Sequence, residues 1–264
     1  MTSQALDLPI DPAGKRILLV NDDGITAPGL RVLEKIARQF SNDVWVFAPE
    51  VEQSGAGHSI TLNGAIRVAK VGRQRYSVAG SPTDCVLIAI SEFMKDTPPD
   101  FVLSGVNLGS NIAEDVTYSG TVAAAMEAAL LGFPAIALSQ AAGYGKAVRW
   151  HVAQKFGPDI VRKLLSIGWR KDLFVNVNFP DCSPEEVSNV ITVKQGRRSS
   201  GYEIIHVPDQ RGKTYYLIGA PQRGTTVNFG DADHKALERG EIAVTPMHVD
   251  MTHAGSMRDF GVLF

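Results

Sequence analysis

The sequence is poor in the features that mark secreted and membrane proteins. Its 264 residues include two cysteines, Cys85 and Cys182, which belong to neither a CxxC motif nor a Cys/His pattern. This argues against a disulfide framework and indicates a reducing compartment. No apolar run approaches the length of a membrane span, and the N-terminus lacks the basic-then-apolar pattern of a secretion signal. We therefore expect a cytoplasmic protein with no membrane partner.

Positive charge is not in surplus either. Lys and Arg number 26 against 28 Asp and Glu, which gives a net charge of -2 and a pI near 6.3. Nucleic-acid binding proteins generally carry a basic stripe, so we expect no nucleic-acid polymer as a partner. Internal repeats and low-complexity segments are absent, and the length is sufficient for one large core with an extension. Residues 1–14 read as a flexible tail.

The GxGxxG motif of dinucleotide-binding domains is absent after the first expected strand. Residues 17–20 form a short apolar run that predicts a strand buried on both faces, and Asn21-Asp22-Asp23-Gly24 follows it. Two adjacent carboxylates each disfavour ionisation of the other, and a divalent cation between them would remove that cost. The same residues also make an ordinary Asx-turn and helix N-cap, so the pair alone leaves both interpretations open.

Apolar periodicity predicts an α/β core over residues 15–182, with a mostly parallel sheet flanked by helices. A helix over 28–40 and a strand over 43–49 complete a right-handed βαβ unit. The other expected elements are a hairpin over 66–78, helices that begin after Ser81 and Ser119, strands over 100–104, 133–139 and 173–180, and a helix over 148–167 with a kink or a break at Gly157-Pro158. Residues 183–264 predict a β-rich extension of the kind that pairs with another subunit.

Small polar residues follow the expected strands or open the helices beside them. They are Ser54, Asn107, Asn111, Ser119, Gly120 and Thr121. Because the carboxyl ends of parallel strands meet at one rim, we expect these residues to converge on the two aspartates. Oxygen ligands suit magnesium, manganese or calcium, and a free helix start suits phosphate, although a Ser before a helix is also a commonplace cap. None of these loops contains Lys or Arg, which predicts an absolute requirement for metal.

The motifs resemble, in order, those of the SurE survival-protein family of nucleotidases. The matching segments are Val20-Asn21-Asp22-Asp23-Gly24 with Ala27-Pro28-Gly29, Ser54-Gly55 with His58-Ser59-Ile60-Thr61, Gly80-Ser81-Pro82-Thr83-Asp84-Cys85, Ser104-Gly105-Val106-Asn107 with Gly109 and Asn111, Tyr118 to Glu127, Asn176-Val177-Asn178 with Pro180, and Val244-Thr245-Pro246. The resemblance covers nearly the whole chain from Arg16 onward. It implies a Rossmann-like α/β core and a β-rich extension used in homodimers or homotetramers.

The resemblance also implies an activity and a set of site residues. The activity is that of a metal-dependent 5′-nucleotidase, which hydrolyses nucleoside 5′- and 3′-monophosphates and, in some members, short-chain polyphosphate. One divalent cation per subunit, Mg²⁺ or Mn²⁺ (Ca²⁺ in crystals), would be held by Asp22, Asp23, Ser54 and Asn107. Asp22 and Asp23 would be catalytic, and the residues near the substrate would be Asn21, Asn111, Ser119, Gly120 and Thr121. The alternative is a nucleotide-binding Rossmann module without hydrolysis, and a role for His58 as acid or base stays open.

Overall fold

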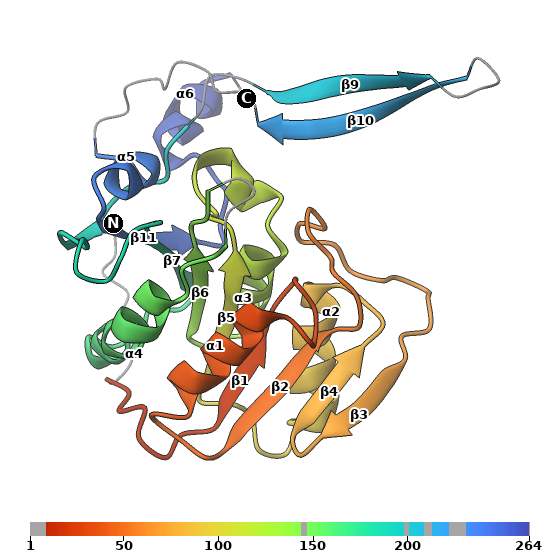
Figure 1. Cartoon of the computed structure of the whole chain (residues 1–264), viewed down its shortest axis with the longest axis vertical. Coiled ribbons are helices and arrows are strands. Elements are labelled where there is room, and N and C mark those ends of the chain that lie inside the picture. The colour runs from red at the N-terminus through yellow and green to blue at the C-terminus, as the bar shows by residue number, and fades with distance from the viewer. Residues whose placement is uncertain (1–8, 144–146, 198–200, 209–212, 222–230, 264) are drawn as a thin grey trace.

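A central sheet of nine strands organises the molecule, in the order β3-β4-β2-β1-β5-β6-β7-β11-β8 (Figure 1). The computed structural model describes residues 9–143, 147–197, 201–208, 213–221 and 231–263. The strands are β1 (Ile17–Val20), β2 (Val44–Pro49), β3 (Val68–Gly72), β4 (Arg75–Val78), β5 (Phe101–Leu108), β6 (Ala135–Gln140), β7 (Leu173–Phe179), β8 (Val190–Thr192) and β11 (Ile242–His248). From β4 to β7 the neighbouring strands are parallel, which confirms the expected fold class.

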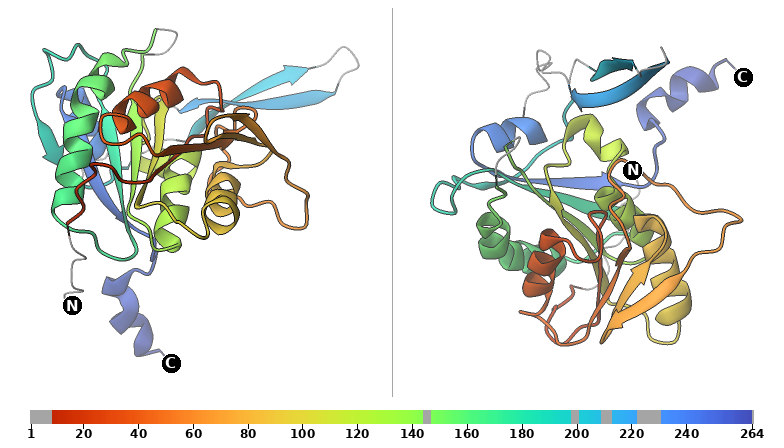
Figure 2. Two further views of the ribbon diagram at one scale, coloured as in Figure 1. Left: turned by 90° about the horizontal axis from the view of Figure 1, so that it is seen from below. Right: turned by 45° about the vertical axis from the view of Figure 1, so that its right-hand side comes forward.

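Helices cover both faces of this sheet (Figure 2). Helices α1 (Pro28–Ala37) and α4 (His151–Ser166) pack on one face, and α2 (Pro82–Ile88) and α3 (Gly120–Leu130) pack on the other. The apolar run of β1 contributes to both sides, because Ile17 and Leu19 join one buried cluster while Leu18 and Val20 join the other. None of the helices in the described ranges has the length and apolar character that a membrane span requires.

The strand order reverses at β1, which lies between β2 and β5. Ile17 pairs with Val44 on one side and with Phe101 on the other, both in parallel register. The connections that leave the carboxyl ends of β1 and β5 therefore diverge to opposite faces. A crevice at such a switch point is the usual ligand site of open α/β sheets.

The expected division of the chain near residue 183 does not coincide with an edge of the sheet. Strand β11 pairs antiparallel with β7 along its whole length, and β8 adds to β11, so two strands beyond that boundary belong to the main sheet. The part that projects is the hairpin of β9 (Tyr202–Pro208) and β10 (Thr214–Pro221), which forms a separate two-stranded sheet (Figure 1). The short helices α5 (Asp233–Glu238) and α6 (Met257–Gly261) complete this half of the chain.

Two local expectations also need correction. The expected tail of residues 1–14 is docked where it is described, since the Ile10 amide donates to the Leu165 carbonyl and Pro12 is buried. Residues 1–8 lie outside the described ranges. Of the kink or break expected at Gly157-Pro158, the break does not occur, because α4 continues through these residues. A Cβ atom at position 157 would lie 2.7 Å from Ile36 Cδ1, so this glycine lets α4 pack closely on α1, and that packing holds the helix together despite the proline.

Candidate active site at the end of β1

Asp22 follows β1 directly and is almost completely buried, with 3% of its surface exposed. Its carboxylate accepts hydrogen bonds from the hydroxyl and the backbone N–H of Thr121, in the first turn of α3. Burial nevertheless raises the pKa of Asp22, and the negative charge of Glu52 acts in the same direction. A carboxylate buried in this way is stabilised when a cation joins it.

Gly120 makes the close approach of α3 to Asp22 possible. A Cβ atom at this position would lie 2.8 Å from Asp22 Cβ and 2.8 Å from Pro82 Cγ. With glycine there, the positive end of the helix dipole meets the carboxylate and stabilises its charged form. The helix start that the sequence predicts as an anion site is thus already directed at the protein's own Asp22.

Asp23 links the end of β1 to the end of β5 by a hydrogen bond. Its Oδ2 accepts a hydrogen bond from the backbone N–H of Leu108 at 3.1 Å. Burial first, and then the charge of Asp22, raise the pKa of Asp23 to about 6. The charged side chains that raise these two pKa values are carboxylates: Glu52 acts on both aspartates, and Asp22 acts on Asp23. The pair therefore has the donor chemistry and the uncompensated charge that fit a hard divalent cation.

The two remaining expected ligands lie at the same rim. Asn107 donates its Nδ2 to the Gly109 carbonyl at 3.0 Å, which leaves the amide oxygen for a ligand. Ser54 is exposed, and its hydroxyl donates to Glu52 Oε1 at 2.8 Å. Asp23, Ser54 and Glu52 line one cavity of about 440 Å³.

Glu52 is not among the site residues expected from the sequence, although a carboxylate two residues before Ser54 was a usable signal. In the described part of the chain, no three His, Cys, Asp or Glu side chains are grouped so that they could hold a metal ion. A cation beside Asp22 and Asp23 would therefore need amide and hydroxyl oxygens as well, which is the kind of ligand set that the sequence predicts.

Asn21 and Asn111 lie behind the rim instead of projecting from it. Asn21 is fully buried, and its Nδ2 donates to the Gly24 carbonyl at 2.9 Å, which closes the turn that carries the aspartates. Asn111 donates Nδ2 to Ser139 Oγ and its backbone N–H to Asn178 Oδ1, both at 2.8 Å. The Asn21 side chain thus fixes the backbone of its own loop, whereas the backbone of Asn111 is held by the side chains of Asn176 and Asn178.

The loop that carries Ser54 is fastened to α3 by two contacts. His58 Nε2 lies 2.7 Å from Oε2 of Glu127, a nearly buried residue of α3. The Gly57 amide donates to the Tyr118 carbonyl at 3.0 Å, just before the N-cap Ser119. His58 and Glu127 are 69 positions apart, so no local pattern in the sequence indicated this pair.

Comparison with known proteins places this arrangement in a family. The model of the family described as "Survival protein SurE" matches residues 17–202. The chain belongs to the SurE family. It is 49% identical over 254 residues to a protein of Paramagnetospirillum magneticum named 5′-nucleotidase SurE, covering 96% of this chain and 97% of that protein. A protein of Parvibaculum lavamentivorans with the same name is 48% identical over 247 residues, or 90% of this chain and 87% of that protein.

The fold of this SurE-family chain is similar to the crystal structure of the SurE protein from Aquifex aeolicus. The TM-score is 0.82 at 35% sequence identity, with 94% of this chain and 99% of that chain covered. The similarity extends beyond residue 183, in agreement with the two late strands of the central sheet.

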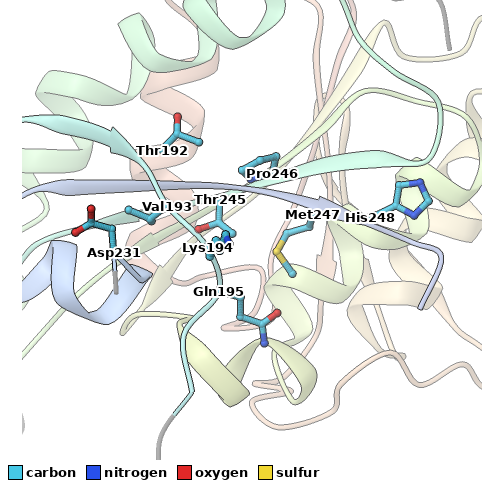
Figure 3. A pocket seen from close by; sticks show the side chains of 9 residues that line it. All are labelled: Thr192, Val193, Lys194, Gln195, Asp231, Thr245, Pro246, Met247 and His248. Atoms are coloured by element: carbon cyan, nitrogen blue, oxygen red, sulfur yellow. The ribbon is translucent and has the colours of Figure 1, made fainter. Parts of the chain in front are cut away.

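A larger cavity, of about 760 Å³, lies on another part of this SurE-family chain (Figure 3). Strand β11 runs across it and carries Thr245 to His248, while residues 192–195 and Asp231 form the other wall. None of the expected site residues lines this cavity. Cavity size therefore does not locate the site, whereas the raised pKa values and the switch point both indicate the end of β1.

Proposed function

We propose that this chain is a metal-dependent 5′-nucleotidase that hydrolyses nucleoside 5′- and 3′-monophosphates to nucleoside and phosphate, with short-chain polyphosphate as a second substrate. The observation that carries the proposal is the pair of adjacent carboxylates at the switch point of the sheet, of which Asp22 is buried and Asp23 is half-buried. The charged side chains that raise their pKa values are carboxylates, and Asp22 faces the start of α3. The names of the relatives from Paramagnetospirillum magneticum and Parvibaculum lavamentivorans support the same activity.

Each residue of the site has a task in this reaction. Oxygens of Asp22, Asp23, Ser54 and Asn107 would hold one Mg²⁺ or Mn²⁺ ion, which when bound supplies Lewis-acid stabilisation of charge on the phosphate. Thr121 orients Asp22, and the Leu108 N–H orients Asp23. At the start of α3 the Thr121 N–H is held by Asp22 and the Val122 N–H by Ser119 Oγ, so the Gly120 N–H is the backbone group that would donate to a phosphate oxygen.

Removal of metal is expected to abolish the reaction. The test measures phosphate release from AMP with Mg²⁺ or Mn²⁺, then with EDTA, then after the metal is restored. We expect release with either metal, none with EDTA, and full recovery, because no Lys or Arg lies in the site loops to replace the cation. Release that persists in EDTA would overturn the metal requirement. Absence of release with every divalent metal would favour a nucleotide-binding module without hydrolysis.

We also propose that the chain forms a homodimer or homotetramer in the cytoplasm. The hairpin of β9 and β10 exposes several apolar side chains, among them Ile204, Tyr216 and Ile218, and an isolated hairpin of this kind is marginally stable alone. The described cysteines are free, as expected in a reducing compartment. Light scattering should give a dimeric or tetrameric mass that falls in an Ile218→Lys variant, and a monomeric wild-type protein would contradict the proposal.

A further inference from the structure

The cavity beside Asp23 is lined by polar and apolar residues together. Asp23, Glu52 and Ser54 are polar, whereas Pro28, Leu108 and Trp150 provide apolar surface. Its volume of about 440 Å³ lies within the range of sites that bind small molecules. The lining therefore suits a ligand that combines a charged group with a flat apolar group.

In the sequence, Trp150 immediately precedes α4. In space, its side chain lies against the start of α1. Its Cη2 atom would be 3.0 Å from a Cβ atom at Gly29, so the glycine allows the indole to pack closely on the helix start. Trp45 and Trp169 donate their indole N–H groups to Asp43 and Leu173. Within the described residues no corresponding hydrogen bond is recorded for Trp150, which packs at the edge of the large core cluster and lines the cavity.

Leu108 links the apolar lining of the cavity to Asp23. The residue is 55% exposed, and its backbone N–H donates a hydrogen bond to Asp23 Oδ2 at 3.1 Å. The apolar surface is thus fixed with respect to the carboxylate by a direct hydrogen bond. Covering such an exposed apolar side chain with a flat ring system is favourable, because it removes apolar surface from water.

We propose that this cavity holds the nucleoside of the substrate, with the base stacked on Trp150 and covered by Leu108, and the phosphate near Asp23. Stacking on an aromatic ring tolerates every base and is strongest for the larger ring systems. The enzyme therefore prefers purine over pyrimidine nucleoside monophosphates and treats AMP and GMP alike within a few-fold. This inference rests on the proposed nucleotidase function and assigns its specificity to a residue outside the expected site.

The test compares AMP with ribose 5-phosphate, a substrate that lacks the base. In the Trp150→Ala variant, the ratio of kcat/KM for AMP to kcat/KM for ribose 5-phosphate should fall by about 5- to 150-fold, mainly through KM for AMP. The Trp150→Phe variant should recover most of the ratio, because phenylalanine retains an aromatic face. A Trp45→Phe variant is the matched control, since Trp45 stacks on Tyr76 away from this cavity.

A binding measurement separates failure of this inference from failure of the proposed function. Adenosine carries no phosphate, so its quenching of tryptophan fluorescence reports the nucleoside cavity independently of hydrolysis. Quenching should occur in the wild-type and Trp45→Phe proteins and disappear in Trp150→Ala, with thermal unfolding used to confirm that each variant is folded. An unchanged substrate ratio, or quenching that survives in a folded Trp150→Ala protein, overturns the inference. Failure of the wild-type protein to hydrolyse AMP, with quenching still dependent on Trp150, rejects the nucleotidase and leaves the nucleoside cavity standing.

Discussion

Replacement of Asp22 by asparagine is expected to lower kcat/KM for AMP by at least about 10³-fold, the scale on which central catalytic groups act. Asparagine has the same size, and its amide oxygen can still accept the hydrogen bond from Thr121. The fold should therefore persist while the negative charge is lost. Asp159→Asn on α4 is a suitable control, because the Asp159 side chain is 70% exposed and pairs with Arg162. Wild-type turnover by Asp22→Asn with Mg²⁺ or Mn²⁺ present would refute the assignment.

The same substitution is expected to stabilise the metal-free protein at neutral pH. Because burial raises the pKa of Asp22, the folded chain binds this proton more tightly than the unfolded chain, so the free energy of unfolding falls as pH rises towards the folded pKa. Asp23 acts with the same sign, and its rise from 3.8 to about 6 corresponds to at most about 3 kcal/mol, lost between pH 4 and 6.

Urea unfolding in EDTA at pH 5 and pH 7.5 measures this effect. The wild-type protein should lose stability across this interval, and Asp22→Asn should lose less, so that the variant is the more stable protein at pH 7.5. If the variant loses both stability and activity, Asp22 is a structural residue that stabilises the fold and has no catalytic role.

Replacement of Gly120 by alanine is expected to lower kcat/KM by about 10²-fold and stability by about 1–3 kcal/mol. Alanine ordinarily favours a helix over glycine, by up to about 1 kcal/mol. Here its Cβ would meet Asp22 and Pro82 at 2.8 Å, so either α3 or the carboxylate must move. The steric cost exceeds the gain in helix propensity, and the displaced carboxylate is a proposed metal ligand.

A second glycine provides the control for this substitution. Gly261 lies in α6, and a Cβ atom there would have no neighbour within 4 Å. Gly261→Ala should leave kcat/KM unchanged. Full activity in Gly120→Ala would show that α3 can shift without disturbing Asp22, and that the close approach has no catalytic importance.

Local chemistry explains why much of the fold was predictable. The run of residues 17–20 is buried on both faces, as a parallel central strand requires, and the spacing of Ser81 and Asp84 produced a complete capping box at the start of α2. The helix start at Ser119 was also correct to within a residue. In each of these cases the signal lies within a few residues of the feature that it predicts.

The features that escaped prediction depend on partners distant in the sequence. Pairing of β11 with β7 joins segments that are about 60 residues apart, so the boundary at 183 could not be corrected from local pattern. Pro158 does not break its helix, which packs on α1 through Gly157 and Ile36, a contact between segments that no local pattern shows. The fit of Gly120 against Asp22 and the place of Trp150 beside Asp23 likewise appear only when separate segments meet.

The late position of β11 has a consequence for synthesis on the ribosome. Strand β7 ends at Phe179, and its antiparallel neighbour begins only at Ile242. At a synthesis rate of about 5–20 residues per second, the nascent chain spends about 3–12 s with the edge of β7 unpaired. An open edge of that kind recruits other strands, so this interval is when the chain most needs a chaperone. Any early stop between these strands would leave that edge open permanently, even though Asp22, Asp23, Ser54 and Asn107 would all be present.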